Sequence, residues 1–309
     1  MNRRDFFKKS LIAGSAAGAF LLFNSSNKIF SQSNNFTKTA GNYDLVAIKG
    51  GMPDIMFDQG IKMFGGMNKI IKKGQTVVVK PNIGWNRSPE YGANTNPKLI
   101  QRIIEHCYDA GAKKVYVFDH SCDFWEYTYK NSGIESATKN ANAIVVPADS
   151  EGHYQSVSVG AGKTLKKTKV HEIMLEADIL INVPVLKSHG GARLTIAMKN
   201  LMGVVWDRGY YHSMGLQQCI ADFCSYRKPD LNIVDAYNVM LRNGPRGRSI
   251  EDVVNMKYQL ISTDIVAVDA AASKIFGLEP DDIPHIKIGN DMKLGTMNLD
   301  KLNIKRMTI

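Results

Sequence analysis

The sequence lacks the cysteine spacing of an iron–sulfur or structural zinc site. Its four cysteines are Cys107, Cys122, Cys219 and Cys224, and they form no CxxC pair. Iron–sulfur and structural zinc sites usually draw on tighter cysteine clusters. A GxxxxGK[ST] phosphate loop is also absent, and GxGxxG does not occur where a dinucleotide-binding fold would need it. The pattern therefore argues against iron–sulfur, P-loop and dinucleotide-binding proteins.

A basic tract interleaved with aromatic residues is missing as well. The formal net charge is +10 over 309 residues, but the lysines are scattered along the chain. We therefore predict no nucleic-acid partner, because nucleic-acid-binding domains gather their basic residues on one face or helix. A mildly basic, otherwise globular composition, with 44% hydrophobic and 22% charged residues, suits a small anionic ligand instead.

Residues 1–33 are interpreted as an export signal. The segment from Asn2 to Lys8 (NRRDFFK) resembles the twin-arginine signal, and a mild apolar run from Leu11 to Phe23 follows it. This run is shorter and richer in glycine than a membrane span, which needs about 20 residues. We therefore expect a periplasmic protein without a stable membrane span after cleavage. Its partner during export would be the twin-arginine translocase, which carries folded proteins.

Residues 43–309 are interpreted as a single α/β domain that follows a polar linker at residues 34–42. Predicted strands such as 76–79 alternate with predicted helices such as 98–110 along most of this stretch. Such alternation is typical of a mostly parallel sheet with helices on both faces. Between about 150 and 175 the pattern changes, and it predicts a small antiparallel insertion.

Polar residues follow four of the predicted strands at the points where these strands end. Because the carboxyl ends of parallel strands meet at one edge of a sheet, we expect these side chains to converge. The residues are Lys80 and Asn82, then Asp119 and His120, then Lys187, Ser188 and His189, and finally Asp235.

The segment 179–204 is the most informative part of the chain. Its apolar start predicts a buried strand, which runs into Lys187, Ser188 and His189 before two glycines. An amphipathic piece then carries Lys199 and Asn200. A strand that ends in polar residues before a helix is where open α/β sheets bind their ligands.

Six segments together resemble one protein family. The chain is similar to the family of the domain of unknown function 362, and Lys199-Asn200 running on to Gly203 is the most specific part of the likeness. Many members of that family carry a ferredoxin module, which implies iron–sulfur chemistry, but this chain has no CxxCxxC and does not inherit that implication. The layout of residues 76–120 (strand, Lys-Pro-Asn, helix, Gly-Ala, strand, Asp-His) also resembles the N-terminal region of nickel-pincer lactate racemases. The six segments are VVVKPN (77–82), TNP (95–97), NVPVLKSH (182–189), LTIAMKNLMG (194–203), NIVDA (232–236) and STDIVAVDAAASKIFGL (262–278).

The predicted roles follow from the chemistry of each residue type. Lysines hold an anion or a cofactor phosphate, asparagines orient it, and a histidine transfers protons because imidazole titrates near neutral pH. Imidazole and carboxylate together also suit a divalent metal such as Zn, Ni or Fe. We predict catalytic roles for His189, Lys187 and Asp119, ligand binding by Lys80, Asn82, Ser188, Lys199, Asn200 and Asp235, and metal binding by His120.

Two functions fit these residues. The first is a periplasmic enzyme that acts on a small anionic substrate, with a metal or cofactor in redox or isomerase-type chemistry. The second is a non-catalytic protein that binds an anionic ligand or delivers a cofactor. The feature that separates them is a nucleophile, base or metal beside the lysines. The first function requires Lys80, Lys187 and His189 to converge.

Overall fold

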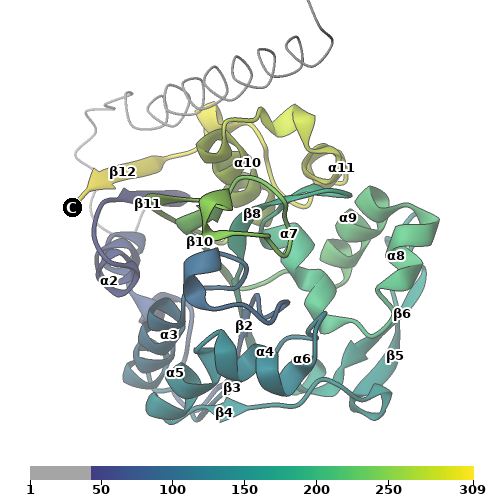
Figure 1. The fold of residues 1–309 in the computed structure, drawn as a ribbon, viewed down its shortest axis with the longest axis horizontal. Helices are drawn as coiled ribbons and strands as arrows, with labels where there is room; N and C mark the ends of the chain where they lie inside the picture. Colours follow the sequence, from purple (N-terminus) through teal and green to yellow (C-terminus); the bar gives the residue numbers. More distant parts are fainter. Residues whose placement is uncertain (1–42) are drawn as a thin grey trace, which may run out of the picture.

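The computed structural model describes residues 43–309, so the predicted signal peptide and linker lie outside the described residues. Ten of the strands in the described part form one mixed sheet (Figure 1). The main path across this sheet is β12-β1-β11-β10-β7-β2-β3-β4. The bounds are Ile304–Thr308 (β12), Leu45–Lys49 (β1), Val253–Ser262 (β11), Leu231–Met240 (β10), Ile179–Val183 (β7), Thr76–Pro81 (β2), Lys114–Val117 (β3) and Ile144–Val145 (β4).

The prediction of a mostly parallel sheet is confirmed. β10, β7, β2, β3 and β4 run parallel to one another, and β12 runs parallel to β1. On this path the exception is β11, which is antiparallel to both β10 and β1. β11 follows β10 directly along the chain and pairs with it without a crossover helix, so its carboxyl end lies at the edge opposite to the ends of β2, β7 and β10.

Helices cover both faces of the sheet, as predicted. The helices α2 (Pro53–Phe64), α3 (Pro97–Asp109) and α5 (Ile134–Asn140) pack on one face, and α7 (Ala197–Asn200), α9 (Leu216–Tyr226), α10 (Ile265–Phe276) and α11 (Pro284–Asp291) on the other. Side chains of a strand alternate between the two faces. In β2, the side chains of Val77 and Val79 pack in the apolar cluster beneath α2, α3 and α5, and the side chain of Val78 packs in the apolar cluster on the opposite face.

Local sequence sets where these helices begin and end. The Asn96 side chain accepts a hydrogen bond from the Lys98 amide at 3.0 Å, with Pro97 in the first turn of α3. Asp264 caps α10 in the same way. Two short helices, α4 (Trp125–Asn131) and α5, occupy the stretch 125–140, because Gly133 adopts a φ of 74° between them and ends the first.

The predicted antiparallel insertion is confirmed. β5 (Tyr154–Ser158) and β6 (Lys167–His171) form a separate two-stranded sheet, and the short helix α6 (Glu172–Glu176) returns the chain to β7. Within the described range, no helix combines the length and the apolar character that crossing a membrane requires.

The chain reaches the third group of polar residues, Lys187 to His189, through a second strand that follows β7. β7 lies between β2 and β10, and Pro184 interrupts it. The chain continues as β8 (Val185–His189), which still pairs with β10 and forms a hairpin with β9 (Arg193–Thr195). α7 and the 3-10 turn Leu201–Val204 follow at once. The hairpin therefore stands above the carboxyl ends of β2 and β3, where a pocket can form.

Candidate functional site

A row of buried polar residues crosses four neighbouring strands beneath the site. Lys80 of β2 is in register with Asn182 of β7, Asn182 with Asn232 of β10, and Asn232 with Ser262 of β11. All four are at most 1% exposed. The Asn182 amide donates to the Asn232 side-chain oxygen at 3.0 Å, and the Asn232 amide donates to the Ser262 carbonyl at 3.4 Å. We call these four residues the polar row.

Asn200 joins the polar row from the helix that covers it. Its Nδ2 donates to the Asn182 side-chain oxygen at 2.9 Å, and its Oδ1 accepts from Lys80 Nζ at 3.0 Å. The N-terminus of α7 is held in turn by Asp269 of α10, whose carboxylate accepts from the amides of Ala197 at 2.7 Å and Met198 at 3.0 Å. The four-residue helix is thus tied to the sheet at one end and to α10 at the other.

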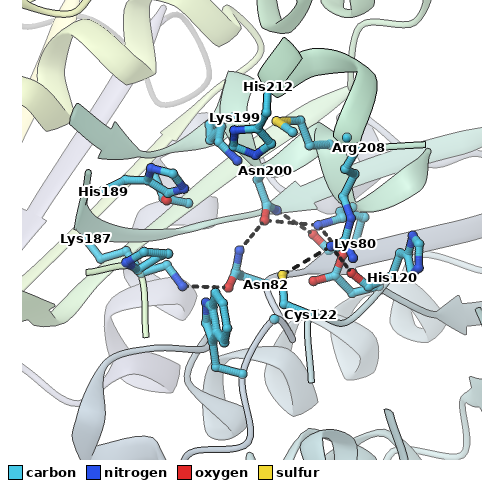
Figure 2. Close-up of a pocket in the computed structure, with 18 residues that line it drawn as sticks. Lys80, Asn82, His120, Cys122, Lys187, His189, Lys199, Asn200, Arg208 and His212 are labelled. Carbon is cyan, nitrogen blue, oxygen red and sulfur yellow. Dashed lines mark hydrogen bonds and ion pairs between the residues drawn. The ribbon is translucent and has the colours of Figure 1, made fainter. Parts of the chain in front are cut away.

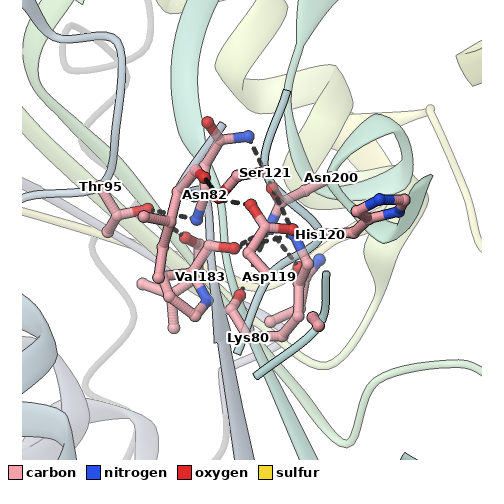
Figure 3. Close-up of polar contacts among 12 residues, drawn as sticks. Lys80, Asn82, Thr95, Asp119, His120, Ser121, Val183 and Asn200 are labelled. Carbon is pink, nitrogen blue, oxygen red and sulfur yellow. Dashed lines mark hydrogen bonds and ion pairs between the residues drawn. The ribbon is translucent and has the colours of Figure 1, made fainter. Parts of the chain in front are cut away.

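The Lys80 ammonium has an acceptor for each of its three protons. It donates to the Pro81 carbonyl at 2.8 Å and to Asn200, and its Nζ lies 2.9 Å from Asp119 Oδ1 (Figure 3). Burial lowers the pKa of Lys80, and the contact with Asp119 opposes that shift. An ammonium carries three donors, so Lys80 has none left for a ligand. The predicted role of Lys80 in holding an anion is therefore not one that its hydrogen bonds support.

Asp119 and Gly203 complete this buried ion pair. Asp119 Oδ2 accepts from the Ile83 amide at 2.6 Å, which places the loop after β2 over the loop after β3. Gly203 packs so closely that an added Cβ would lie 1.7 Å from Asp119 Oδ1 and 2.6 Å from Lys80 Nζ. The Lys199-to-Gly203 segment of the motif therefore has a physical cause: its last residue needs a hydrogen in place of a side chain.

A cavity of about 400 Å³ opens above this network, at the carboxyl ends of β2 and β3 (Figure 2). This is within the range of small-molecule sites, about 300–1,000 Å³. Eight of the ten predicted site residues line it, so the structure brings most of them together. These eight are Lys80, Asn82, Asp119, His120, Lys187, His189, Lys199 and Asn200.

The two other lysines of the pocket have fewer acceptors than Lys80. Lys187 Nζ donates to Asn82 Oδ1 at 3.0 Å and to the Ala93 carbonyl. One of its three protons therefore remains for a ligand. The side-chain amine of Lys199 forms no hydrogen bond or ion pair with any other residue of the described part of the chain, although the side chain lines the pocket. Its amine is thus entirely available to the cavity.

Burial in this cationic pocket lowers the pKa of both lysines. Burial lowers the pKa of Lys187 to about 7, and nearby Lys199 adds to the shift. Burial lowers the pKa of Lys199 to about 8, with further contributions from the charges of Arg208 and Lys80. Removing an amine from water disfavours its charged form, and so does a neighbouring cation. Each lysine can therefore exchange a proton near neutral pH.

His189 is held as a neutral imidazole. Its Nδ1 accepts from the amides of Gly191 at 3.2 Å and Ala192 at 3.1 Å, so the ring hydrogen is on Nε2. Burial, together with the charges of Lys199 and Lys187, lowers the pKa of His189 to about 3. The premise that this imidazole titrates near neutral pH therefore does not hold. His189 instead offers a neutral N–H donor.

The loop after β3 is held against the pocket by an arginine that the sequence did not single out. Arg208 donates to the carbonyls of His120 at 2.7 Å and Ser121 at 2.9 Å, and its Nη1 lies 3.3 Å from Cys122 Sγ. Arg208 and Cys122 both line the cavity. The site therefore has one more cation and one thiol than the sequence predicted.

The residues present do not fit a metal centre. The His120 Nδ1 is 3.0 Å from the Val205 carbonyl, and its ring stacks on Trp206 with centroids 4.9 Å apart. Over residues 43–309, no group of three or more His, Cys, Asp or Glu side chains could hold a metal ion. His120 is a wall residue of the pocket in this arrangement, and we derive no step through a metal.

Two predicted binding residues lie outside the pocket. Ser188 sits between Lys187 and His189 in β8, so its side chain points to the other face of the strand, where its Oγ accepts from the Gly244 amide at 3.1 Å. Asp235 accepts from the amides of Asn96 at 2.7 Å and Tyr237 at 3.0 Å. Its buried carboxylate holds the start of α3 and is not presented to a ligand.

Several residues that build the site gave weak sequence signals. Asn182 and Asn232 each interrupt an apolar strand (ILINV and LNIV), and a buried asparagine needs hydrogen-bond partners. That interruption is a signal that could have identified the polar row. Arg208 and Cys122 gave no comparable signal, because each lies in an irregular segment whose position depends on the tertiary fold.

The fold and the pocket define an α/β protein with a cationic cavity at the carboxyl edge of its parallel strands. The family model of the domain of unknown function DUF362 matches residues 77–274, which is more than half of the chain and includes every residue of the pocket. The chain belongs to this family, as the sequence motifs predicted.

Two known proteins are similar to this chain, one in sequence and one in structure. The thylakoid-associated protein sll1697 of Synechocystis sp. (strain ATCC 27184 / PCC 6803 / Kazusa) is 24% identical over 232 residues, which cover 72% of this chain and 70% of that protein. The lactate racemase apoprotein from Thermoanaerobacterium thermosaccharolyticum is similar in structure with a TM-score of 0.47 and 13% identity, over 78% of this chain. The match covers 60% of the racemase chain, which is less than two thirds of its length.

Proposed function

We propose that the pocket binds a small anionic molecule and catalyses a reaction of that molecule. The observation that carries the proposal is the set of cationic donors left without protein acceptors. Lys199 has no partner among the described residues, and Lys187 keeps one proton free. The carboxylate that lines the pocket, Asp119, is already paired with Lys80. Lys187 is buried and Lys199 is partly buried. A charged donor without an acceptor is costly in such surroundings, and a bound anion would lower that cost.

The pocket residues divide into those that bind and those that transfer protons. Lys199 and Arg208 attract the anion, Lys187 and the Nε2–H of His189 donate to it, and Asn82 fixes the Lys187 amine. With a pKa of about 7, Lys187 can accept or donate a proton at neutral pH. Proton transfer next to a carboxylate is the elementary step of an isomerase-type reaction. Lys80 and Asp119 serve in this scheme as the support of the site.

The alternative is a non-catalytic protein that captures an anion or delivers a cofactor. The same open donors would serve it, but such a protein needs no group that titrates near pH 7. The lowered pKa of Lys187 therefore favours catalysis, because a lysine that only binds an anion works best when its charge is permanent.

Titration calorimetry with small carboxylates and phosphates tests the binding step. A Lys199→Met or Lys187→Met variant removes a charge-assisted hydrogen bond of about 1.5–3 kcal/mol, so the Kd should rise roughly tenfold to a hundredfold. Lys274→Met is the matched control, because Lys274 pairs with Glu279 far from the pocket. Equal affinity in all four proteins, or no binding of any anion, would contradict the proposal. Turnover then separates an enzyme from a carrier.

We also propose that the protein acts in the periplasm after twin-arginine export. The support is the order of Arg3, Arg4, two phenylalanines and an apolar run. Replacing Arg3 and Arg4 by lysine keeps the charge and removes the signal, so the protein should stay in the cytoplasmic fraction of the cells. Unchanged periplasmic accumulation would overturn the export proposal and leave the pocket proposal intact.

A further inference from the structure

Lys199 presents an amine to the pocket that no other described residue engages. We propose that this amine is a nucleophile that forms an imine with a small carbonyl compound bearing a carboxylate or phosphate group. The inference rests on the proposed function, because the anionic group of the substrate would occupy the other cationic donors. It adds the substrate class and the covalent step.

The first support is the position of Lys199. It lies on α7, which Asp269 holds at its first turn and Asn200 holds at its last residue. The backbone that carries the amine is therefore fixed relative to the cavity. A nucleophile beside a bound substrate gains from proximity, because folding has already ordered the backbone that carries it and binding has already cost the substrate its translational and rotational freedom.

The second support is the division of labour among the three lysines. Lys80 has all three protons engaged, and Lys187 is clamped between Asn82 and the Ala93 carbonyl. Lys199 alone of the three has a nitrogen free to turn its lone pair towards a substrate. Burial and nearby cations also lower its pKa to about 8, so a useful fraction of neutral amine exists at neutral pH.

The step balances in atoms and charge. The Lys199 lone pair attacks the carbonyl carbon, and the C=O π electrons move to oxygen. The nitrogen loses a proton and the oxygen gains one, giving a neutral carbinolamine. The Lys187 ammonium then gives a proton to the hydroxyl, which leaves as water while the nitrogen lone pair forms the C=N bond. The products are a protonated imine on Lys199, one water molecule and a neutral Lys187 amine, with no oxidant or reductant consumed.

Borohydride trapping tests this inference on the folded protein. The mature chain would be incubated with glycolaldehyde phosphate or glyoxylate, reduced, digested and mapped by mass spectrometry. We expect a stable secondary amine on Lys199. Glycolaldehyde, which has the same carbonyl without the phosphate, should label Lys199 far more weakly. Equal labelling by glycolaldehyde, or labelling spread over surface lysines, would show that the pocket does not direct the reaction and would overturn the inference.

Variants separate the nucleophile from the cation. Lys199→Arg keeps a positive charge and lacks a nucleophilic amine, so it should still bind phosphoglycolate, an anion without a carbonyl, and should lose the adduct. Lys187→Met should retain the modified residue but form it more slowly. An adduct on Lys187 or no adduct at all in a protein that binds phosphoglycolate would overturn the inference and leave the proposed function standing. If phosphoglycolate and the other small anions fail to bind, the proposed function fails first.

The thiol of Cys122 is a second nucleophile in the same cavity, and borohydride reduction distinguishes its adduct from an imine. Cys122 is exposed and lies next to Arg208, so it could add to an aldehyde. A thiol adduct carries no C=N bond and is not fixed by borohydride. Cys122→Ser should therefore leave the trapped amount on Lys199 unchanged. A loss of trapping in Cys122→Ser, with phosphoglycolate binding intact, would show that the pocket does not form the Lys199 adduct without the thiol and would overturn the inference.

Discussion

The polar row and the pocket wall, by which we mean Lys187 and Lys199, both contain lysine. They differ in how many of the lysine protons have a hydrogen-bond acceptor. In the row, Lys80 has three acceptors, and Asn182 and Asn232 bond to each other and to their neighbours. In the wall, Lys187 has two acceptors and Lys199 has none among the described residues.

This difference separates support from function. A buried lysine whose protons are all engaged stabilises the fold, and removing it exposes its partners to a non-polar surrounding. A lysine with unused protons costs stability in the empty protein and can regain it from a ligand. Replacing row residues should therefore damage folding, whereas replacing wall residues should damage binding and spare folding.

The largest expected effect is that of Lys80→Met. Without the ammonium, the Asp119 carboxylate is left buried and unpaired, so the free energy of unfolding should fall by about 3–5 kcal/mol. Urea unfolding followed by circular dichroism measures it. The double variant Lys80→Met/Asp119→Asn should recover part of the loss, because the unpaired charge is gone. A loss below about 1 kcal/mol, the level of an exposed ion pair, would break the comparison.

The next effect in size is that of Gly203→Ala. An added Cβ would lie 1.7 Å from Asp119 Oδ1, so the segment after Asn200 must shift, at a cost of about 1–3 kcal/mol for overpacking. The matched control is Gly190→Ala in the hairpin turn, where a Cβ would meet nothing within 4 Å. Thermal unfolding compares the two variants. Similar melting temperatures would mean that Gly203 is not a contact of the row.

The third effect, on the wall, depends on pH. The pKa values of Lys187 and Lys199 are lowered from 10.5 to about 7 and about 8. Between these values and 10.5 the unfolded chain binds more protons than the folded one, so stability rises with pH over that window. Urea midpoints at pH 7 and pH 9.5 should therefore differ more in the wild type than in Lys187→Met/Lys199→Met.

The difference between the two proteins isolates the wall lysines, because every other titrating group is common to both. At pH 7 the double variant should be at least as stable as the wild type, since it lacks two unfavourably buried amines. Parallel pH dependence in the two proteins would contradict the lowered pKa values. A marked loss of stability of the double variant at pH 7 would show that Lys187 and Lys199 stabilise the fold, as the residues of the polar row do.

The sheet and the edge on which the site lies could be predicted from sequence. Alternating strands and helices imply parallel strands, and parallel strands bring Lys80, Asp119 and Lys187 to one edge. Individual side chains were harder to place. Ser188 was assigned to the pocket because the sequence shows that a strand alternates, but not which of its two faces meets the cavity. Asp235 was also predicted to bind the ligand, because the sequence does not show whether a carboxylate after a strand contacts a ligand or accepts a hydrogen bond from a backbone amide.

The features that the sequence did not predict depend on contacts between residues far apart in the chain. Lys80 and Lys187 are alike in sequence, since each ends a β-branched or apolar strand, and only the number of acceptors around each amine separates them. Those acceptors, such as Asn200 and the Ala93 carbonyl, come from other parts of the chain. The sequence shows Asn182 and Asn232 only as members of their strands, because the hydrogen bond between their side chains forms only when the two strands pair.

The polar row also favours a single register of the strands. Moving β7 by one residue against its neighbours would turn Asn182 to the opposite face, among the apolar side chains beneath α2 and α3. Asn182 and its former partner Asn232 would then lack hydrogen bonds, at about 1–3 kcal/mol for each buried group. A slipped sheet is thus penalised where the pocket floor forms, so the register that satisfies the polar row is also the register that brings the lysines of the pocket together.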